Sequence, residues 1–110
     1  MSDQFIGVDV GGTKIAVAVL EGGELSESRV VSTNQASQEA LVEQLAVAIE
    51  GSMGPSVRSV GIGMPSVIDF GTGKILASVN IPLHDLPLRQ LLTDRIGVPV
   101  YVENDAGCAA

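Results

Sequence analysis

Two apolar runs joined by a pair of glycines near the start of the chain are the feature that most restricts the fold. The runs cover residues 5–10 and 14–20, and Gly11-Gly12 lies between them. Two glycines between apolar runs are typical of a tight β-hairpin. Gly22-Gly23 marks a second turn, and residues 25–32 have the composition of a third strand. The chain is therefore predicted to open as a three-stranded antiparallel meander.

Helical and strand patterns alternate after the meander. A helix is predicted over residues 37–50, a strand over 57–64, and a hairpin over 67–79 that turns at Gly71 and Gly73. In the predicted helix over residues 37–50, apolar residues recur at helical spacing. They form one apolar face, made of Leu41, Leu45, Ala48 and Ile49.

A second helix has clear signals at both ends. Asp85 is expected to be its N-cap, Pro87 lies in its first turn, and Gly97 is expected to be its C-cap. A short buried strand over residues 100–102 should follow, and a third helix should begin at Asn104. Because that helix has no stop signal, we expect residues 1–110 to be an N-terminal lobe that is cut within its third helix.

This order of elements predicts an α/β fold with a five-stranded mixed sheet. Three antiparallel strands come first, two parallel strands are added by helical crossovers, and helices flank the sheet. Ligands of such sheets bind beyond the carboxyl ends of the parallel strands. The polar residues that follow those strands are therefore the candidate site.

Composition excludes several classes of function. The net charge of the 110 residues is −7, which argues against binding the phosphate backbone of nucleic acids. No apolar run approaches the roughly 20 residues of a membrane span, and the first residues lack the features of a signal peptide. The single cysteine, Cys108, cannot form an intrachain disulfide. We expect a cytoplasmic protein with no membrane or nucleic-acid partner.

The first candidate site is the turn between the first two strands. Gly11 and Gly12 allow a close approach of the backbone to a ligand, and successive N–H groups in such a turn can bind an anion. Thr13 adds a hydroxyl group and Lys14 a positive charge, while Asp9 could hold Mg²⁺ directly or through water. The alternative is an ordinary hairpin with a solvated acid and lysine, which a Gly-Gly turn alone would favour.

The second and third candidates follow the two parallel strands. In Glu103-Asn104-Asp105, Asp105 could accept a proton from a substrate hydroxyl and Asn104 could bind another hydroxyl. Helix capping is the competing explanation, because Asn and Asp are common N-caps. In residues 61–69, glycines would permit close approach of a ligand, and Pro65-Ser66 should form a turn. A plain strand and turn is the alternative, which this segment taken alone would favour.

Taken together, these segments resemble one known family. The chain is similar to the N-terminal domain of the ROK family (repressor, open reading frame, kinase), and especially to its glucokinases. The similarity covers nearly the whole chain, in the family's order and spacing. It is carried by GVDVGGTKIAVAVL at 7–20, GIGMPSVID at 61–69, NIPLHDLPLRQLL at 80–92 and PVYVENDAGCAA at 99–110.

The resemblance implies a ribonuclease-H-like, actin-like ATPase fold of two lobes with a cleft between them. It also implies transfer of a phosphoryl group from ATP·Mg²⁺ to a hexose hydroxyl, with glucose as the expected sugar. By this resemblance Asp105 matches the general base, Asn104 a sugar-binding position, and residues 9–14 the first phosphate loop. Ser66 and Asn80 fall in segments that shape the sugar pocket.

Two positions depart from the family pattern. Ser66 stands where Gly is frequent, and Gly107 stands where Asn is usual. Gly107 should weaken the third helix by up to about 1 kcal/mol relative to Ala. It also removes an amide that could brace the site. Both departures bear on the choice of sugar and on activity.

The resemblance also defines what a second lobe would supply. In this family the second lobe carries the adenosine site, further sugar ligands and usually a Cys/His zinc site. Cys108 alone cannot make a four-ligand zinc site, and we expect it to act as a small buried hydrophobe. His84, the only histidine, is interpreted as a loop residue. We also expect a homo-oligomer, and we expect the lobe alone to be inactive and to self-associate.

Two other functions compete with a sugar kinase. A sugar-sensing transcriptional repressor of the same family would need a DNA-binding domain, for which there is no room before Phe5. A non-catalytic interaction domain of actin-like fold would need neither Asp9 nor Asp105. Polyphosphate in place of ATP as the phosphoryl donor also stays open.

Overall fold

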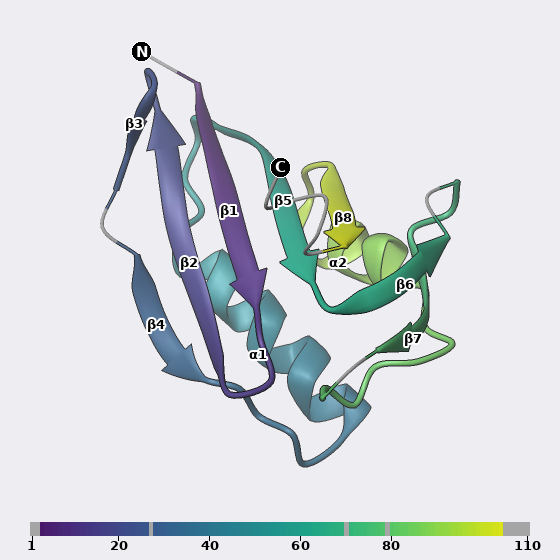
Figure 1. Cartoon of the computed structure of the whole chain (residues 1–110). Coiled ribbons are helices and arrows are strands. Elements are labelled where there is room, and N and C mark those ends of the chain that lie inside the picture. The colour runs from purple at the N-terminus through teal and green to yellow at the C-terminus, as the bar shows by residue number, and fades with distance from the viewer. Residues whose placement is uncertain (1–2, 27, 70, 79, 105–110) are drawn as a thin grey trace.

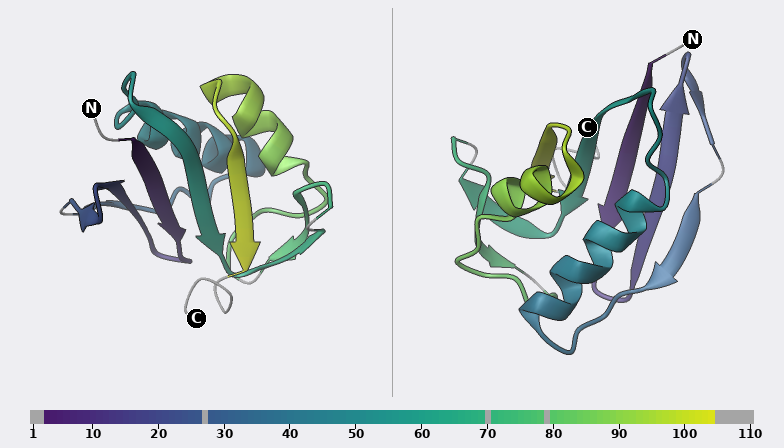
Figure 2. Two further views of the ribbon diagram at one scale, coloured as in Figure 1. Left: turned by 90° about the horizontal axis from the view of Figure 1, so that it is seen from above. Right: turned by 180° about the vertical axis from the view of Figure 1, so that it is seen from behind.

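One mixed β-sheet with two helices on a single face forms the body of the molecule (Figure 1; Figure 2). The computed structural model describes residues 3–26, 28–69, 71–78 and 80–104. The sheet has the order β3-β2-β1-β5-β8, with β4 also paired to β2. A two-stranded sheet of β6 and β7 stands beside it. The predicted combination of antiparallel and parallel strands is therefore confirmed.

The N-terminal hairpin consists of β1 (Gln4–Val10) and β2 (Lys14–Glu21). They pair antiparallel from Gln4↔Glu21 to Val10↔Ile15, so the turn falls at the two glycines, as expected. Alternate residues of both strands, such as Ile6 and Val17, are buried against the helices.

The predicted third strand is split into β3 (Glu24–Leu25) and β4 (Arg29–Ser32), which both pair with β2. The backbone N–H of Val19 donates to the hydroxyl of Ser26 at 2.8 Å instead of to a backbone carbonyl. This side-chain bond interrupts the ladder, which resumes at Val17↔Arg29.

Parallel strands complete the sheet. β5 (Val57–Met64) pairs with β1, with Gly7 opposite Gly61, and β8 (Val100–Asn104) pairs with β5, with Gly61 opposite Tyr101. Asn104 is thus the last residue of a strand and not the start of a helix. The remainder of the expected third helix lies outside the described residues.

The first helix, α1 (Gln38–Glu50), lies on the same face of the sheet as the second helix (Figure 2). Ser37 is its N-cap, and its hydroxyl accepts a hydrogen bond of 3.1 Å from the N–H of Ala40. Leu41, Leu45 and Ile49 are fully buried, which confirms the predicted apolar face. They pack in one core with residues of the strands and of α2.

The second helix, α2 (Leu88–Ile96), begins later than its sequence signals indicate. Pro87 occupies the N-cap position, so the prediction for Asp85 is wrong. Leu86 pairs with Ile75, and this brings the carboxylate of Asp85 to 2.7 Å from the ammonium of Lys74. The lysine holds the pKa of the Asp85 carboxyl below its usual value. Gly97 ends the helix in the left-handed region, as expected.

The predicted hairpin is present as β6 (Ser66–Asp69) and β7 (Lys74–Ser78). Ser66 belongs to the first strand, however, and not to a turn. Gly73, at the end of the turn, has a φ of +74° and packs against the side chain of Arg89. Neither helix in the described part of the chain is long and apolar enough to cross a membrane.

Gly73→Ala should lower the free energy of unfolding by at least about 1 kcal/mol, because L residues disfavour this left-handed conformation. The new Cβ would also lie 2.3 Å from the Cβ of Arg89. Gly54→Ala is the matched control, because a Cβ there meets no atom within 4 Å. Chemical unfolding measures both effects, and equal values for the two variants would contradict this account.

Candidate functional site

The carboxyl ends of β1, β5 and β8 meet at one edge of the sheet (Figure 1). In register, Asp9 lies opposite Gly63, Gly63 opposite Glu103, and Met64 opposite Asn104. The glycine turn follows β1, and Ser66 lies two residues after the end of β5. Parallel pairing thus brings three of the segments predicted from the sequence to the same edge.

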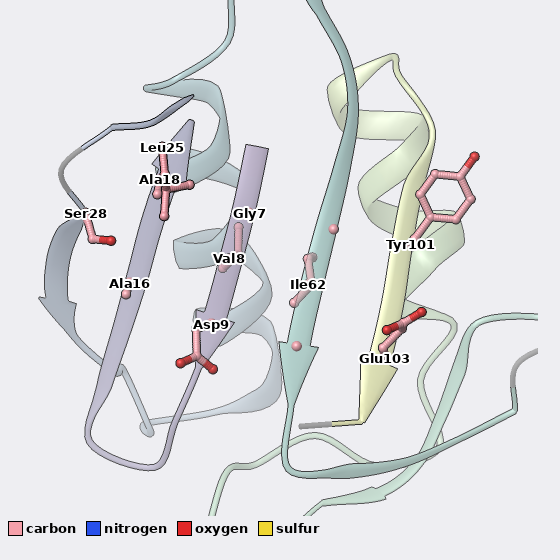
Figure 3. A pocket seen from close by; sticks show the side chains of 12 residues that line it. Gly7, Val8, Asp9, Ala16, Ala18, Leu25, Ser28, Ile62, Tyr101 and Glu103 are labelled. Carbon is pink, nitrogen blue, oxygen red and sulfur yellow. The ribbon is translucent and has the colours of Figure 1, made fainter. Parts of the chain in front are cut away.

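An open groove lies on the sheet face away from the helices, with Asp9 and Glu103 in it (Figure 3). Its volume is about 970 Å³. The floor is made of small residues from three strands, namely Gly7, Ala16, Ala18, Gly61 and Gly63. Asp9 is exposed there, so its carboxylate is accessible for a cation or for water. Within the described residues, no cluster of three or more metal-binding side chains is present.

The glycine turn presents unused hydrogen-bond donors. The N–H of Gly11 closes the turn on the carbonyl of Lys14 at 2.9 Å. Among the residues described, the N–H groups of Gly12 and Thr13 form no hydrogen bond. The ammonium of Lys14 forms no ion pair in this part of the chain either. The turn therefore offers two backbone donors and a positive charge, a combination that suits an anion.

Close packing, and not a positive φ, explains glycine at position 12. A Cβ on Gly12 would lie 3.0 Å from the Cβ of Asn80 and 3.3 Å from its carbonyl oxygen. Asn80 itself has a φ of +63°, a conformation that asparagine tolerates better than most residues. The structure thus joins the glycine turn to one of the residues predicted to shape the sugar pocket. No signal in the sequence predicts this contact.

Ser66 and Asn104 are connected at the ends of their strands. The side-chain amide of Asn104 donates to the carbonyl oxygen of Ser66 at 2.7 Å. The hydroxyl of Ser66 shares a hydrogen bond of 2.6 Å with the hydroxyl of Ser78, and Ser66 is only 3% exposed. Ser66 is therefore turned into the protein, where it fixes the position of Asn104. Ser78 was not among the residues that the sequence singled out.

Three predicted residues take no place in this description of the site. Asp105, Gly107 and Cys108 lie outside the described residues. His84 is exposed in the loop before α2, as expected, and its backbone N–H donates to the side chain of Gln38 at 2.8 Å.

Comparison with known proteins defines the class to which this chain belongs. The structure matches a ROK hexokinase from Thermus thermophilus with a TM-score of 0.86 and 40% identity over 97% of this chain and 37% of that one. A ROK family glucokinase from Streptomyces griseus, in complex with glucose and AMPPNP, matches with a TM-score of 0.86 and 38% identity. This match covers 96% of this chain and 34% of that one. The fold is therefore the ribonuclease-H-like lobe of the actin-like ATPases, in the form that sugar kinases use.

Sequence comparisons identify the family. Residues 5–110 match the ROK family, and this chain belongs to it. It is 40% identical over 108 residues to a glucokinase of Streptomyces coelicolor, which covers 96% of this chain and 33% of that protein. A putative xylose repressor of Caldicellulosiruptor sp. is 26% identical over 113 residues, covering 96% of this chain and 28% of the repressor. The chain thus spans about a third of the length of these relatives.

Asn104→Asp should destabilise the protein by about 1–3 kcal/mol, because it replaces the donor to Ser66 by a carboxylate facing a carbonyl oxygen. Asn34→Asp adds the same charge but keeps the bond at that site, since the side-chain oxygen of Asn34 accepts from the N–H of Ala36. Thermal unfolding at neutral pH should separate the two variants. Equal stability would show that the Asn104 bond does not hold the strand ends.

Proposed function

We propose that this chain is the N-terminal lobe of an ATP-dependent sugar kinase that transfers the γ-phosphoryl group of ATP to a hexose hydroxyl, converting glucose to glucose 6-phosphate. The observation that carries the proposal is the meeting of two kinds of group at one sheet edge. The glycine turn has N–H donors that would suit an anion, Asn80 packs against that turn, and Asn104 lies at the same edge; the amides of these two residues would suit sugar hydroxyls. The glucose- and AMPPNP-bound relative from Streptomyces griseus supports the choice of ligands.

The phosphate end of the site consists of residues 9–14. The N–H groups of Gly12 and Thr13, with the ammonium of Lys14, would bind phosphate oxygens of ATP. The exposed carboxylate of Asp9 would hold the Mg²⁺ that accompanies ATP, directly or through water. These residues fit a substrate that is both anionic and cation-bound.

The sugar end consists of Asn80, Asn104 and Asp105. We infer that the two amides bind sugar hydroxyls, while Asp105, the next residue after β8, accepts the proton of the hydroxyl that attacks. The part of Ser66 is indirect, because its hydroxyl is used by Ser78 and its carbonyl oxygen holds Asn104. Serine at this position is then compatible with sugar binding, although glycine is frequent there in the family.

Positioning and charge neutralisation are the main demands of phosphoryl transfer. A base beside the sugar hydroxyl and donors beside the γ-phosphate would meet both demands from one lobe. The other two thirds of the protein would supply the adenosine site, the remaining sugar ligands and any zinc site. For this reason we propose that the complete cytoplasmic protein is active and that this lobe alone is not.

A sugar-sensing repressor is the second candidate, because one relative is a putative xylose repressor. Such a protein would bind a sugar at the same edge without a need for the general base or the phosphate turn. Sugar phosphorylation by the complete protein separates the two functions. We expect ATP-dependent phosphorylation of glucose, and a comparison with polyphosphate identifies the donor. Sugar binding without phosphorylation by either donor would favour the repressor.

Asp105→Asn in the complete protein should lower kcat by at least about 100-fold, the usual scale for losing a general base. Sugar binding should change much less, because the side chain keeps its size and an oxygen acceptor. Asp94→Asn is the control, because Asp94 is exposed on α2 and its bond from Gln90 survives the change. Steady-state kinetics measure both variants, and a loss below tenfold for Asp105→Asn would exclude the base role.

A further inference from the structure

Three successive carbonyl groups of the glycine turn are bound by one segment of the chain. The hydroxyl of Thr33 donates to the carbonyl oxygen of Gly11 at 2.8 Å, and the backbone N–H of Thr33 donates to that of Thr13 at 3.0 Å. The side-chain amide of Gln35 donates to the carbonyl oxygen of Gly12 between them. Residues 33 and 35 thus hold the carbonyl oxygens of Gly11, Gly12 and Thr13 by hydrogen bonds.

This arrangement sets the direction of the N–H groups. In a planar trans peptide, the N–H points opposite to the carbonyl of the same peptide group. When the carbonyls of Gly11 and Gly12 face residues 33–35, the N–H groups of Gly12 and Thr13 therefore point away from that segment. These are the same two N–H groups that have no acceptor within the described residues. Within the described residues, these two N–H groups have no acceptor because the carbonyls of the same peptide groups face residues 33–35.

The segment is itself held by α1. The side-chain amide of Gln44 donates to the carbonyl oxygen of Ser32 at 2.7 Å, and its oxygen accepts from the N–H of Asn34 at 2.8 Å. Thr33 lies between these two bonds. Its position is therefore set by hydrogen bonds to α1, a helix whose apolar face is buried in the core, which makes the segment a firm support.

We propose that Thr33 and Gln35 are positioning residues that orient the N–H groups of Gly12 and Thr13 toward the phosphates of the nucleotide. This inference rests on the proposed kinase function for the identity of the anion, but the support itself does not depend on it. Residues 32–36 are mostly polar and have the composition of a simple linker. Thr33 lies beside Thr13 because the preceding residue, Ser32, pairs with Lys14 in the sheet.

Thr33→Val in the complete protein tests the proposal, because valine keeps the branched shape and removes only the hydroxyl donor. We expect kcat/KM for ATP to fall about tenfold through a higher KM for ATP, while the KM for the sugar stays within twofold of that of the parent. Thr33→Ser restores the hydroxyl and should recover most of the loss. Gln35→Leu should act in the same direction as Thr33→Val. Thr72→Val is the matched control, since Thr72 is an exposed turn residue whose hydroxyl bonds only a nearby backbone N–H.

A general loss of folded protein would lower kcat for both substrates and would leave the KM for ATP unchanged, so the kinetic pattern separates positioning from simple destabilisation. If Thr33→Val keeps kcat/KM for ATP within twofold of the parent value, the proposal is wrong.

Hydrogen exchange supplies a measurement that does not need activity. In Thr33→Val, the bonded N–H groups of Gly11 and Thr33 should exchange about tenfold faster than in the parent protein, while those of α1 should not change. Faster exchange in a protein that phosphorylates no sugar would leave the support intact and overturn only the kinase function. Unchanged exchange would overturn the support whatever the activity.

Discussion

The parallel pairing of β5 with β1 on one side and β8 on the other is the constraint on which the rest of the structure depends. Antiparallel neighbours would send successive loops to opposite edges of the sheet, whereas parallel strands end together. This pairing requires long crossovers, and α1 and α2 provide them while burying one face of the sheet in a common core. The polar segments meet at one edge because the core of the domain enforces this strand order.

The sequence predicts those parts of the fold that are determined by short-range signals. The two glycines between apolar runs locate the first hairpin, and the spacing of the apolar residues in α1 locates that helix to within one residue. Asp85 fails as a predicted N-cap because tertiary pairing overrides local preference: the pairing of Leu86 with Ile75 brings Asp85 to Lys74. The split of the third strand also escapes prediction, since it depends on one hydroxyl of Ser26 bonding across the ladder.

The sequence predicts which residues belong to the candidate site, but it does not predict which contacts each of them makes. Ser66 appears in the sequence as a pocket residue, yet its hydroxyl is bound to Ser78 and only its carbonyl oxygen reaches Asn104. Thr33 gives no signal at all, because a polar residue before a helix N-cap is unremarkable. Such roles follow from contacts between residues 12 to 38 positions apart in the sequence, which only the strand register reveals.

The contact between Gly12 and Asn80 gives the site a property that neither residue has alone. Asn80 belongs to the side assigned to the sugar, and Gly12 belongs to the turn assigned to phosphate, yet their atoms leave no room for a Cβ between them. Residues 33–35 bind the carbonyl oxygens of Gly11 and Gly12 in the same turn, so the turn is in contact with two other segments of the chain. The separation of Gly12 and Asn80 is therefore set by close packing. Under the proposed function, a change of sugar preference in this lobe would then be easier to reach through the side chain at position 80 than through the turn, or through Asn104, whose amide also holds the carbonyl oxygen of Ser66.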